Sequence, residues 1–576
     1  MTGRSSSSRR LKSTDETQSS SSKRQGRSSS NRRLVRASTT EPTTRRTRGS
    51  SSTRLPTNKD SNKEDELRQL QFQSYDFIRK SSRPFDQYYD LGTMLGEGAF
   101  GAVYACEHKA TGNTRAVKIL PKSAADEEAN KLAYQEFKMM AKLDHPNIAK
   151  TYELFEDNNC FYIVTDLYKG GDLFDVLEQK GTLSEYETAM VANSLIMSVG
   201  YCHENKLVHR DLKPENVLLE IDGDFDYAGA KVIDFGLACF EKKRGDKFTE
   251  SLGSLEYVAP QVLASCYGRG ADVWSIGVIL YVLLAGHPPF NGHTDAEIIA
   301  AIQKGDFVFS SPKWNNVSKD AKDFIENLLT FDEEARPSAA TALTHKWLVK
   351  MRKQQRKEHD GKMWQTLTEA LNALEGFRSR HSKFKQAVAV LVATQFLTKE
   401  DRELIDPLFR ELDGGCRGSI TKEDLLNAFW CTDFLNDSRT EEDMKKIMKE
   451  VNFSKTGSIT YAEFAAVVLL ETGRVDKDRL KVVFDYFDTS NKGDIDWRSL
   501  AKVLFPDRGS RYAETVGKKM IAEVTDQRYI SFSAFKRLML PSSSSSRSSR
   551  ESDNRQSNKD PIKGDFRASS SAAVVA

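Results

Sequence analysis

The spacing of hydrophobic positions divides the chain into stretches with different periods. Residues 85–348 begin with segments in which apolar and polar residues alternate and glycines interrupt the pattern. This alternation is typical of half-buried strands. Further along the same stretch, long segments carry apolar residues at three- and four-residue spacing, which indicates helices. Strands followed by helices predict an α+β fold for this stretch.

Two other stretches show only the helical period. Residues 349–400 open on a charged run and pass into an amphipathic helix. Residues 401–540 contain four helix–loop–helix units whose loop centres recur every 35–40 residues or so, which marks an internal repeat. The loop centres lie near Gly418, Gly457, Gly493 and Arg528. The units are predicted at residues 401–436, 439–474, 475–510 and 511–540.

Composition restricts the class of protein. The chain has 576 residues, of which 39% are hydrophobic, and this length allows two or three domains. The longest apolar stretch, residues 274–286, is shorter than the roughly 20 residues that cross a bilayer. No apolar segment follows Met1, and the seven cysteines form no CxxC pair. We therefore expect no secretory leader, no membrane span and no disulfide framework, which fits the cytoplasm, with the nucleus as an alternative.

Charge is distributed unevenly. Residues 1–60 carry 15 Lys and Arg against 4 Asp and Glu, a local charge of 15 − 4 = +11, whereas the whole chain carries +3. Residues 1–84 and 541–576 are Ser-rich and poor in apolar residues, so we predict disordered tails. The basic arm could attract anionic surfaces weakly. No specific nucleic-acid partner is expected, and Thr2, rather than Gly, argues against N-myristoylation.

The first chemical motif is a glycine-rich segment, GEGAFGAV, at residues 96–103. Glycines at this spacing let backbone N–H groups approach a polyphosphate closely. A lysine, Lys118, follows on the next predicted strand and could hold phosphate oxygens. Glu136, on an amphipathic helix, could pair with Lys118 and keep it in place.

A second motif, HRDLKPEN, is far more specific. Asp211 can accept the proton of an attacking hydroxyl, Lys213 can neutralise a moving phosphoryl group, and Asn216 can bind Mg²⁺. Asp234 of a DFG triplet offers a second Mg²⁺ ligand. The order of these motifs along the chain predicts phosphoryl transfer from ATP.

With these motifs, residues 85–348 resemble a eukaryotic Ser/Thr protein kinase, a fold of two lobes that uses ATP and Mg²⁺. The resemblance implies that Thr165 is the gatekeeper and that residues 166–168 form the hinge against adenine. It also implies protein substrates with basic residues before the acceptor, read by Asp172 and Glu215. The residues expected at the ATP site are Leu95, Gly96, Glu97, Gly98, Ala99, Phe100, Gly101, Ala102, Val103, Ala116, Lys118, Glu136, Thr165, Asp166, Tyr168, Asp172 and Glu215.

The chain departs from the kinase pattern at two positions. Gln261 replaces the acid that normally pairs with Arg336, so charge assistance is lost and we expect a softer but active C-lobe. Glu250 stands where many kinases carry a phosphothreonine against the arginine of HRD, here Arg210. A permanent carboxylate there predicts activity without phosphorylation of the activation loop.

The four C-terminal units have a glycine at the sixth loop position, as in the EF-hand, whose calcium ligands include a bidentate Glu at position 12. A kinase followed by a junction helix and four such units resembles the calcium-dependent protein kinases of plants and protists. The second and third loops keep the most oxygen ligands. Those retained are Asn452, Ser454, Thr456, Ser458 and Glu463 in the second loop and Asp488, Ser490 and Asp496 in the third.

Several substitutions nevertheless argue against calcium at micromolar levels. A cation stands inside the first loop as Arg417 and inside the third as Lys492, where it opposes Ca²⁺. Position 12 is Ser499 in the third loop and Ala534 in the fourth. We expect a kinase regulated by an EF-hand-like domain with weak or absent calcium binding, and we slightly favour calcium-independent activity.

Three alternatives stay open at this level. The chain could be a nucleotide-binding scaffold without catalysis, an idea supported only by Gln261. It could be a kinase that calcium does activate. The EF-hand half could also be the main binding module. In each case the junction helix, residues 349–400, is expected either to obstruct the substrate cleft or to lie in the EF-hand groove, making the EF-hand domain an intramolecular partner.

Overall fold

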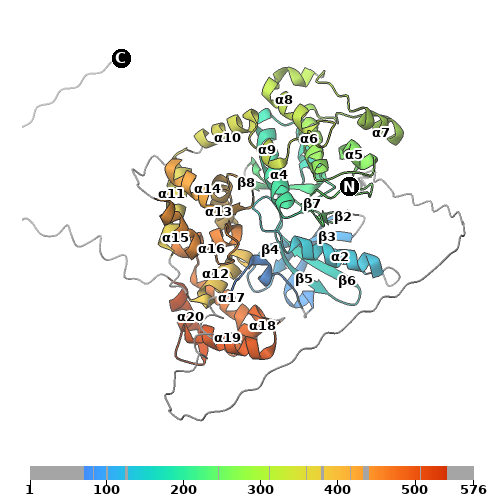
Figure 1. The fold of residues 1–576 in the computed structure, drawn as a ribbon. Helices are drawn as coiled ribbons and strands as arrows, with labels where there is room; N and C mark the ends of the chain where they lie inside the picture. Colours follow the sequence, from blue (N-terminus) through green and yellow to red (C-terminus); the bar gives the residue numbers. More distant parts are fainter. Residues whose placement is uncertain are drawn as a thin grey trace, which may run out of the picture.

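A computed structural model gives the fold of the 576-residue chain (Figure 1). The predicted tails, residues 1–69 and 541–576, lie outside the part that the structure describes. The described residues are 70–81, 84–98, 101–122, 127–222, 224–243, 245–310, 312–358, 360–377, 382–415, 417–431, 440–505 and 508–540.

The first lobe is built on a six-stranded sheet with strand order β1-β5-β6-β4-β3-β2. Its one helix of length is α2 (Glu127–Met140), which lies against the sheet beside β5. A short 3₁₀ helix, η1 (Ser74–Phe77), precedes the first strand, and η2 (Phe85–Gln87) the second. The strands are β1 (Arg79–Lys80), β2 (Tyr89–Gly98), β3 (Gly101–His108), β4 (Thr114–Pro121), β5 (Thr151–Glu156) and β6 (Cys160–Thr165).

The second lobe is mainly helical and surrounds α6, a helix buried on nearly all sides. Short strand pairs at its upper edge carry the loops of the candidate site. The helices are α3 (Leu173–Lys180), α4 (Glu185–Glu204), α5 (Pro260–Leu263), α6 (Gly270–Ala285), α7 (Asp295–Lys304), α8 (Lys319–Leu328) and α9 (Ala339–Ala342). The strands are β7 (Leu207–Val208), β8 (Val217–Asp222), β9 (Asp224–Val232) and β10 (Cys239–Phe240), with 3₁₀ turns η3 (Pro214–Asn216), η4 (Leu255–Tyr257) and η5 (Pro312–Asn316).

The remaining helices form a separate body beside both lobes (Figure 1). Three of them make the junction: α10 (Lys346–Glu358), α11 (Asp360–Gly376) and α12 (Lys383–Gln395). The four repeats supply α13 (Lys399–Leu412), α14 (Lys422–Cys431), α15 (Glu441–Val451), α16 (Tyr461–Glu471), α17 (Lys477–Phe487), α18 (Trp497–Leu504), α19 (Ser510–Ala522) and α20 (Phe532–Met539). We call α13–α20 the EF-hand domain.

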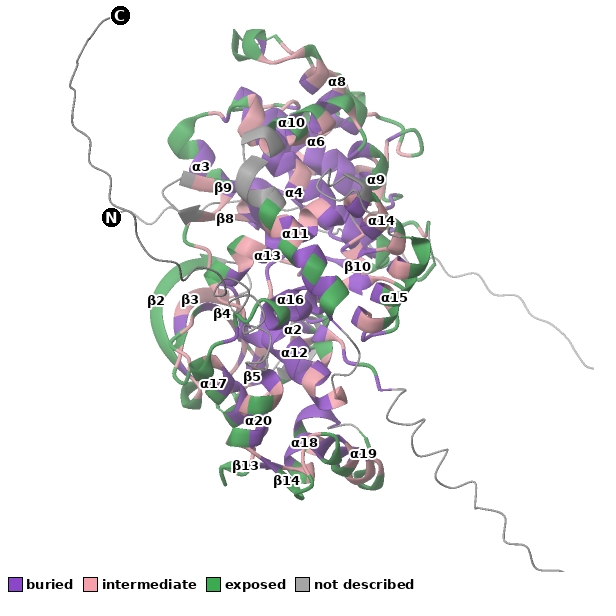
Figure 2. Ribbon diagram, turned by 90° about the vertical axis from the view of Figure 1, so that its left-hand side faces the viewer, coloured by how far each residue is buried: buried purple, intermediate pink, exposed green. Residues whose placement is uncertain are grey.

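Short antiparallel strands join the repeats in pairs, as in EF-hand proteins. Strand β11 (Ser419–Ile420) pairs with β12 (Ile459–Thr460), and β13 (Asp494–Asp496) pairs with β14 (Tyr529–Ser531). The junction helix α12 is buried along its length between these pairs and contacts α16 and α19. The junction therefore occupies the EF-hand groove, one of the two expected arrangements (Figure 2).

The prediction of a disordered arm up to residue 84 is wrong at its C-terminal end. Leu70, Phe72, Phe77 and Ile78 are buried, and β1 adds a parallel strand beside β5. These few apolar residues are surrounded by charged ones, so the segment has low hydrophobicity in any window. Their binding partners lie far away in sequence, and composition does not reveal them.

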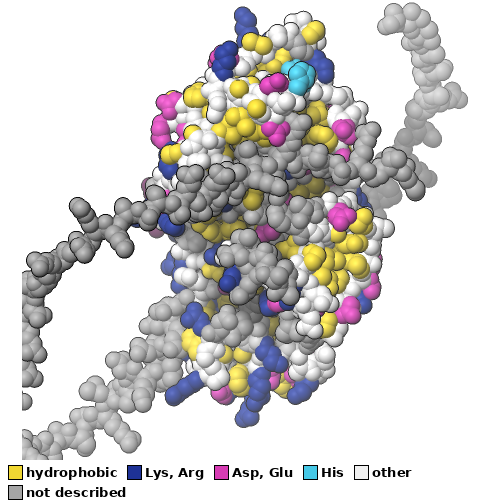
Figure 3. Space-filling model, turned by 90° about the vertical axis from the view of Figure 1, so that its right-hand side faces the viewer, with side chains coloured by type: hydrophobic (Ala, Val, Ile, Leu, Met, Phe, Trp, Pro, Cys, Tyr) yellow, Lys and Arg dark blue, Asp and Glu magenta, His cyan; other side chains and the backbone are white. Residues whose placement is uncertain are grey.

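The surface shows no large continuous apolar region on the face of the molecule opposite the EF-hand domain, among the side chains that Figure 3 displays. Hydrophobic side chains there are interspersed with acidic and basic ones. Within the described ranges, no helix is both long and apolar enough to cross a membrane.

Candidate active site

The glycine-rich segment turns between β2 and β3, which are antiparallel with Gly98 opposite Gly101. Gly101 has φ +146°, and a Cβ there would lie 2.1 Å from the backbone oxygen of Ile119. Only glycine therefore fits where β3 crosses over β4. Leu95, Gly96 and Glu97 are exposed above the cleft. Two predicted ATP contacts, Ala99 and Phe100, lie outside the described residues.

Beneath this turn, a lysine is held between two carboxylates. Nζ of Lys118, on β4, lies 2.8 Å from Oε1 of Glu136 on α2 and 3.5 Å from Oδ1 of Asp234. Burial alone would lower the pKa of Lys118, but the two carboxylates outweigh it and raise that pKa. The lysine is therefore a fixed cation. The predicted Lys118–Glu136 pair is present.

Across the cleft, the residues of HRDLKPEN converge on Asp211. Its carboxylate accepts a hydrogen bond of 2.8 Å from the hydroxyl of Ser254, which in turn accepts one of 3.1 Å from Nζ of Lys213. The side-chain amide of Asn216 donates to the backbone oxygen of Asp211 at 2.8 Å. These contacts fix a buried carboxylate at the floor of the cleft.

A buried aspartate of the second lobe shapes the loop that carries Asp211. Asp272, on α6, accepts hydrogen bonds from the backbone N–H groups of His209 and Arg210 at 3.0 and 2.9 Å and from Nε2 of His203 at 2.9 Å. Arg210 adopts φ +70°, which is uncommon outside glycine and needs such support. The pattern of the sequence places Asp272 in the family motif but does not reveal this role.

The site suits a magnesium ion held partly by phosphate. Because the amide nitrogen of Asn216 is engaged with Asp211, its oxygen is left for a cation, and Asp234 provides a carboxylate opposite. Lys118 lowers the pKa of Asp234 although burial opposes this, so Asp234 is ionised. No cluster of three or more His, Cys, Asp or Glu side chains at metal-binding distance occurs among the described residues. Two protein ligands plus phosphates are what Mg²⁺ commonly uses.

The hinge differs in part from the sequence prediction. Thr165 ends β6 opposite Ala116, at the back of the predicted adenine site. The side chain of Asp166 does not face this site: it accepts hydrogen bonds from the hydroxyls of Tyr152 and Tyr168 at 2.6 and 2.8 Å. Only backbone atoms of Asp166 are left for adenine. The hydroxyl of Tyr168 is engaged in the same way.

Two acids predicted to read basic substrates lie near each other beside the cleft. Asp172 is the N-cap of α3 and accepts from the N–H of Asp175 at 2.9 Å. Burial, with Asp175 and Glu215 nearby, raises the pKa of Asp172 to about 6. Burial also raises the pKa of Glu215, whose Oε2 is enclosed and has no hydrogen-bond partner among the described residues. Such a pair is suited to a guanidinium.

Both departures from the kinase pattern form contacts. Arg210 Nη1 lies 3.5 Å from Oε2 of Glu250, and its Nε donates to the backbone oxygen of Leu237 at 2.6 Å. Arg336 Nη2 donates to Oε1 of Gln261 at 3.0 Å. Burial lowers the pKa of Arg336 to about 10. The amide thus replaces the usual carboxylate as an acceptor without supplying charge.

The first EF-hand loop is closed by a side chain of its own. Nη2 of Arg417, at loop position 5, lies 2.6 Å from Oδ2 of Asp424, at position 12. Asp413, at position 1, accepts from the N–H groups of Arg417 and Gly418 at 3.0 and 2.7 Å. Burial raises the pKa of Asp413 to about 6. The guanidinium joins the parts of the loop that calcium joins in a functional EF-hand.

The second and third loops bring their predicted ligands together. In the second, Asn452 accepts from the hydroxyl of Ser454 at 3.2 Å, and Thr456 donates to the backbone oxygen of Ser458. Glu463 accepts from two backbone N–H groups, and burial raises its pKa to about 7.

In the third loop, Asp488 accepts from Ser490 and from the backbone of Lys492. Asp496 instead caps α18 by accepting from the N–H of Ser499 at 2.8 Å. Ser499 at position 12 is buried and supplies no carboxylate. In the fourth loop, Ala534 offers no side-chain oxygen at all.

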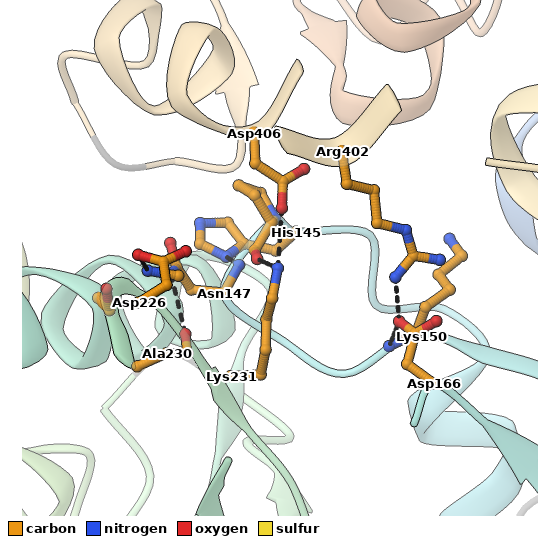
Figure 4. Close-up of polar contacts among 12 residues, drawn as sticks. His145, Asn147, Lys150, Asp166, Asp226, Ala230, Lys231, Arg402 and Asp406 are labelled. Atoms are coloured by element: carbon orange, nitrogen blue, oxygen red, sulfur yellow. Dashed lines mark hydrogen bonds and ion pairs between the residues drawn. The ribbon is translucent and has the colours of Figure 1, made fainter. Parts of the chain in front are cut away.

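The EF-hand domain contacts the hinge through ion pairs that sequence reasoning missed (Figure 4). From α13, Nη1 of Arg402 lies 2.6 Å from Oδ2 of Asp166. One turn further, Oδ2 of Asp406 lies 2.8 Å from Nζ of Lys231 on β9. All four side chains are at least three-quarters buried. Partners so far apart in sequence leave no local signal.

A second contact uses the first calcium loop itself. Gly418, with φ +67°, packs on α4 so closely that a Cβ would lie 2.1 Å from Cδ2 of Tyr201. The N–H of Ala462 donates to Oδ2 of Asp144 at 3.0 Å. The kinase face used is thus the hinge, β9 and α4. Among the described residues, no hydrogen bond or ion pair joins residues 349–540 to Asp211, Lys213 or Asn216.

Comparisons with known proteins agree with this geometry. The family model described as "Protein kinase domain" matches residues 89–348, and the model described as "EF-hand domain pair" matches residues 402–469. Calcium-dependent protein kinase 4 of Plasmodium berghei is 32% identical over 440 residues, 74% of this chain and 82% of its own length.

Two more relatives have the same identity. Calcium-dependent protein kinase 4 of Plasmodium falciparum aligns over 457 residues, which is 77% of this chain and 85% of its own. For calcium-dependent protein kinase 3 of Plasmodium berghei the match covers 79% of this chain and 80% of the relative. A Ser/Thr protein kinase domain joined to an EF-hand domain over nearly the full length of these relatives places the chain in the calcium-dependent protein kinase family.

Proposed function

We propose that this kinase works without calcium, because its EF-hand domain is fixed behind the catalytic domain by side chains of the chain itself. The observation that carries the proposal is the guanidinium of Arg417, which closes the first calcium loop where that loop packs on Tyr201. The protein transfers phosphate from ATP to Ser or Thr of protein substrates, and the proposal concerns its residues, its substrate preference and its control.

In the proposed chemistry, Asp211 accepts the proton of the substrate hydroxyl as its oxygen bonds to the γ-phosphorus and the bond to the ADP oxygen breaks. Lys118 holds phosphate oxygens, and Lys213 faces the transferred group. Mg²⁺, when bound, neutralises phosphate charge, and Asn216 and Asp234 would hold it. The hydroxyl of Ser254, between Lys213 and Asp211, keeps both side chains in position.

Replacing Ser254 by Ala should lower kcat by about 10- to 100-fold, because a hydrogen bond to a charged group contributes roughly 1.5–3 kcal/mol. The KM for ATP should change little. Steady-state assay with a Ser peptide measures both constants, and Ser254→Thr should restore most of the rate. As a control, Ser251→Ala removes a neighbouring hydroxyl that contacts Val262 and Ser265 instead. Equal rates for the two alanine variants would contradict the role of Ser254.

We also propose that substrates carry an arginine before the acceptor. The support is the acidic pair Asp172 and Glu215, which lies beside the cleft and has an enclosed oxygen without a hydrogen-bond partner among the described residues. An arginine side chain could satisfy that oxygen and pair with both carboxylates.

The pH dependence of KM tests this preference. Asp172, whose pKa is raised to about 6, is charged above that pH and neutral below it. Lowering the pH from about 7.5 to about 5.5 should therefore raise the KM of an Arg-containing peptide, by about fivefold if one exposed ion pair is lost. With Asp172→Asn the KM should be high and nearly independent of pH. An unchanged wild-type KM across this range would refute the preference.

Glu250 is proposed to replace an activating phosphate. Its carboxylate faces Arg210, which also anchors the backbone of Leu237 next to the DFG turn. Glu250 is 60% exposed, so solvent screens the pair and its contribution is modest.

Glu250→Ala should consequently lower kcat about three- to tenfold in protein treated with phosphatase, since the cation of Arg210 loses its partner. Glu334→Ala, which removes an exposed carboxylate bound to Lys247 on the same lobe, is the matched control. If the Glu250 variant turns over as fast as the Glu334 variant, the carboxylate has no activating role.

Calcium control is tested on the full-length protein. We expect the same kcat, within about twofold, in buffered Ca²⁺ and in chelator, and no calcium binding near micromolar concentration by calorimetry. Asp211→Asn in both buffers excludes a contaminating kinase. A tenfold rise of kcat in calcium would overturn the proposal.

A gain-of-binding variant shows that the calorimetry can detect a site. Lys492→Asp together with Ser499→Glu gives the third loop an acid at position 5 and a Glu at position 12. This double variant should bind one calcium ion.

A further inference from the structure

The segment just before the kinase domain joins two hydrophobic cores that are otherwise separate. We call residues 70–81 the strap. Phe77 belongs to the buried cluster of the EF-hand domain and junction, whereas the adjacent Ile78 belongs to a cluster of the first kinase lobe. Both side chains are at least 95% buried. One peptide unit therefore connects the two cores.

On the EF-hand side, the strap is anchored by side chains and by its backbone. Leu70 and Phe72 share the cluster of Phe77, and η1 contacts α12 and α18. Nε2 of Gln395, at the end of α12, donates to the backbone oxygen of Phe77 at 2.9 Å. Nζ of Lys383, at the start of α12, donates to the backbone oxygen of Leu70 at 3.3 Å. The junction helix thus holds both ends of this part.

On the kinase side, the strap reaches the helix that carries Glu136. Strand β1 pairs in parallel with β5, and the N–H of Ser81 donates to the backbone oxygen of Leu154 at 2.7 Å. Ile78 shares its buried cluster with Phe137 and Ala141, at the C-terminal part of α2. Phe137 follows Glu136 directly. The ammonium of Lys80 lies 5.9 Å from the ring centroid of Tyr134, also on α2.

We propose that the strap transmits the docked position of the EF-hand domain to α2 and so keeps Glu136 against Lys118. In this role Phe77 and Ile78 are positioning residues, because neither lies at the ATP or substrate site. The strap gives the regulatory domain a hold on the active site without entering the cleft. The inference needs the kinase activity but not calcium independence, and the following assays are therefore made in both calcium and chelator.

Full-length Phe77→Ala cuts the EF-hand side of the strap, and Ile78→Ala cuts the kinase side. Each should lower kcat about tenfold and raise the KM for ATP, since Lys118 loses its fixed partner. Amide exchange in residues 130–141 should be about tenfold faster in both variants. Combining the two should add little, because either break interrupts the same connection.

The matched control is Tyr75→Ala, in the same 3₁₀ helix but with a side chain 43% exposed. It should change neither kcat nor exchange in α2. Ile78→Val and Phe77→Leu, which keep most of the volume, should restore the rate and serve in place of an alanine variant that does not fold.

Two results would overturn the proposal. One is an alanine variant that folds and has the kcat of Tyr75→Ala. The other is a loss of kcat with unchanged exchange in α2, which would mean that the strap acts elsewhere. A kcat that depends on calcium in all variants alike would contradict the proposed calcium independence and leave the strap intact.

Discussion

The arrangement of the whole protein depends on the ion pair between Asp166 of the hinge and Arg402 of the EF-hand domain. Docking itself buries both charges. Burial opposes the ionised form of Asp166, but Arg402 lowers its pKa well below the usual range. Desolvation cancels much of the attraction in such a pair, so its main effect is to specify one docked geometry. With Asp406 and Lys231 one turn away, α13 fits the hinge in a single register.

This geometry explains how a loop that no longer resembles a calcium site can keep a function. In an EF-hand, a divalent cation draws the first and last loop positions together. Here a guanidinium that is part of the chain contacts the last position, and the first position is satisfied by backbone N–H groups. The same loop then presents Gly418 to Tyr201, where only glycine fits. Substitutions that weaken a sensor are compatible with a permanent docking surface.

Much of the catalytic site could be predicted from the sequence, whereas the docking could not. Lys118, Asp211 and Asn216 belong to short motifs whose spacing is fixed by one strand or one loop, and the structure brings them together as expected. Ser254 was visible only as part of a motif, and its contact with Asp211 needed the fold.

Longer distances in sequence account for what was missed. Asp166 and Arg402 are 236 positions apart, and each alone is an ordinary surface charge in the sequence. The strap was assigned to a disordered arm because its apolar side chains bury themselves in two different cores. Neither core shows a periodicity that extends into residues 70–81.

Gln395 brings the two connections between the domains together. Its amide nitrogen donates to the backbone oxygens of Phe77 in the strap and Tyr152 in β5, and its own backbone oxygen accepts from Nη2 of Arg115 in β4. The hydroxyl of Tyr152 is in turn bonded to Asp166 at the hinge. Every polar group named here is buried, so losing one contact would leave another group unsatisfied. The hinge and the strap therefore respond together to a movement of the regulatory domain.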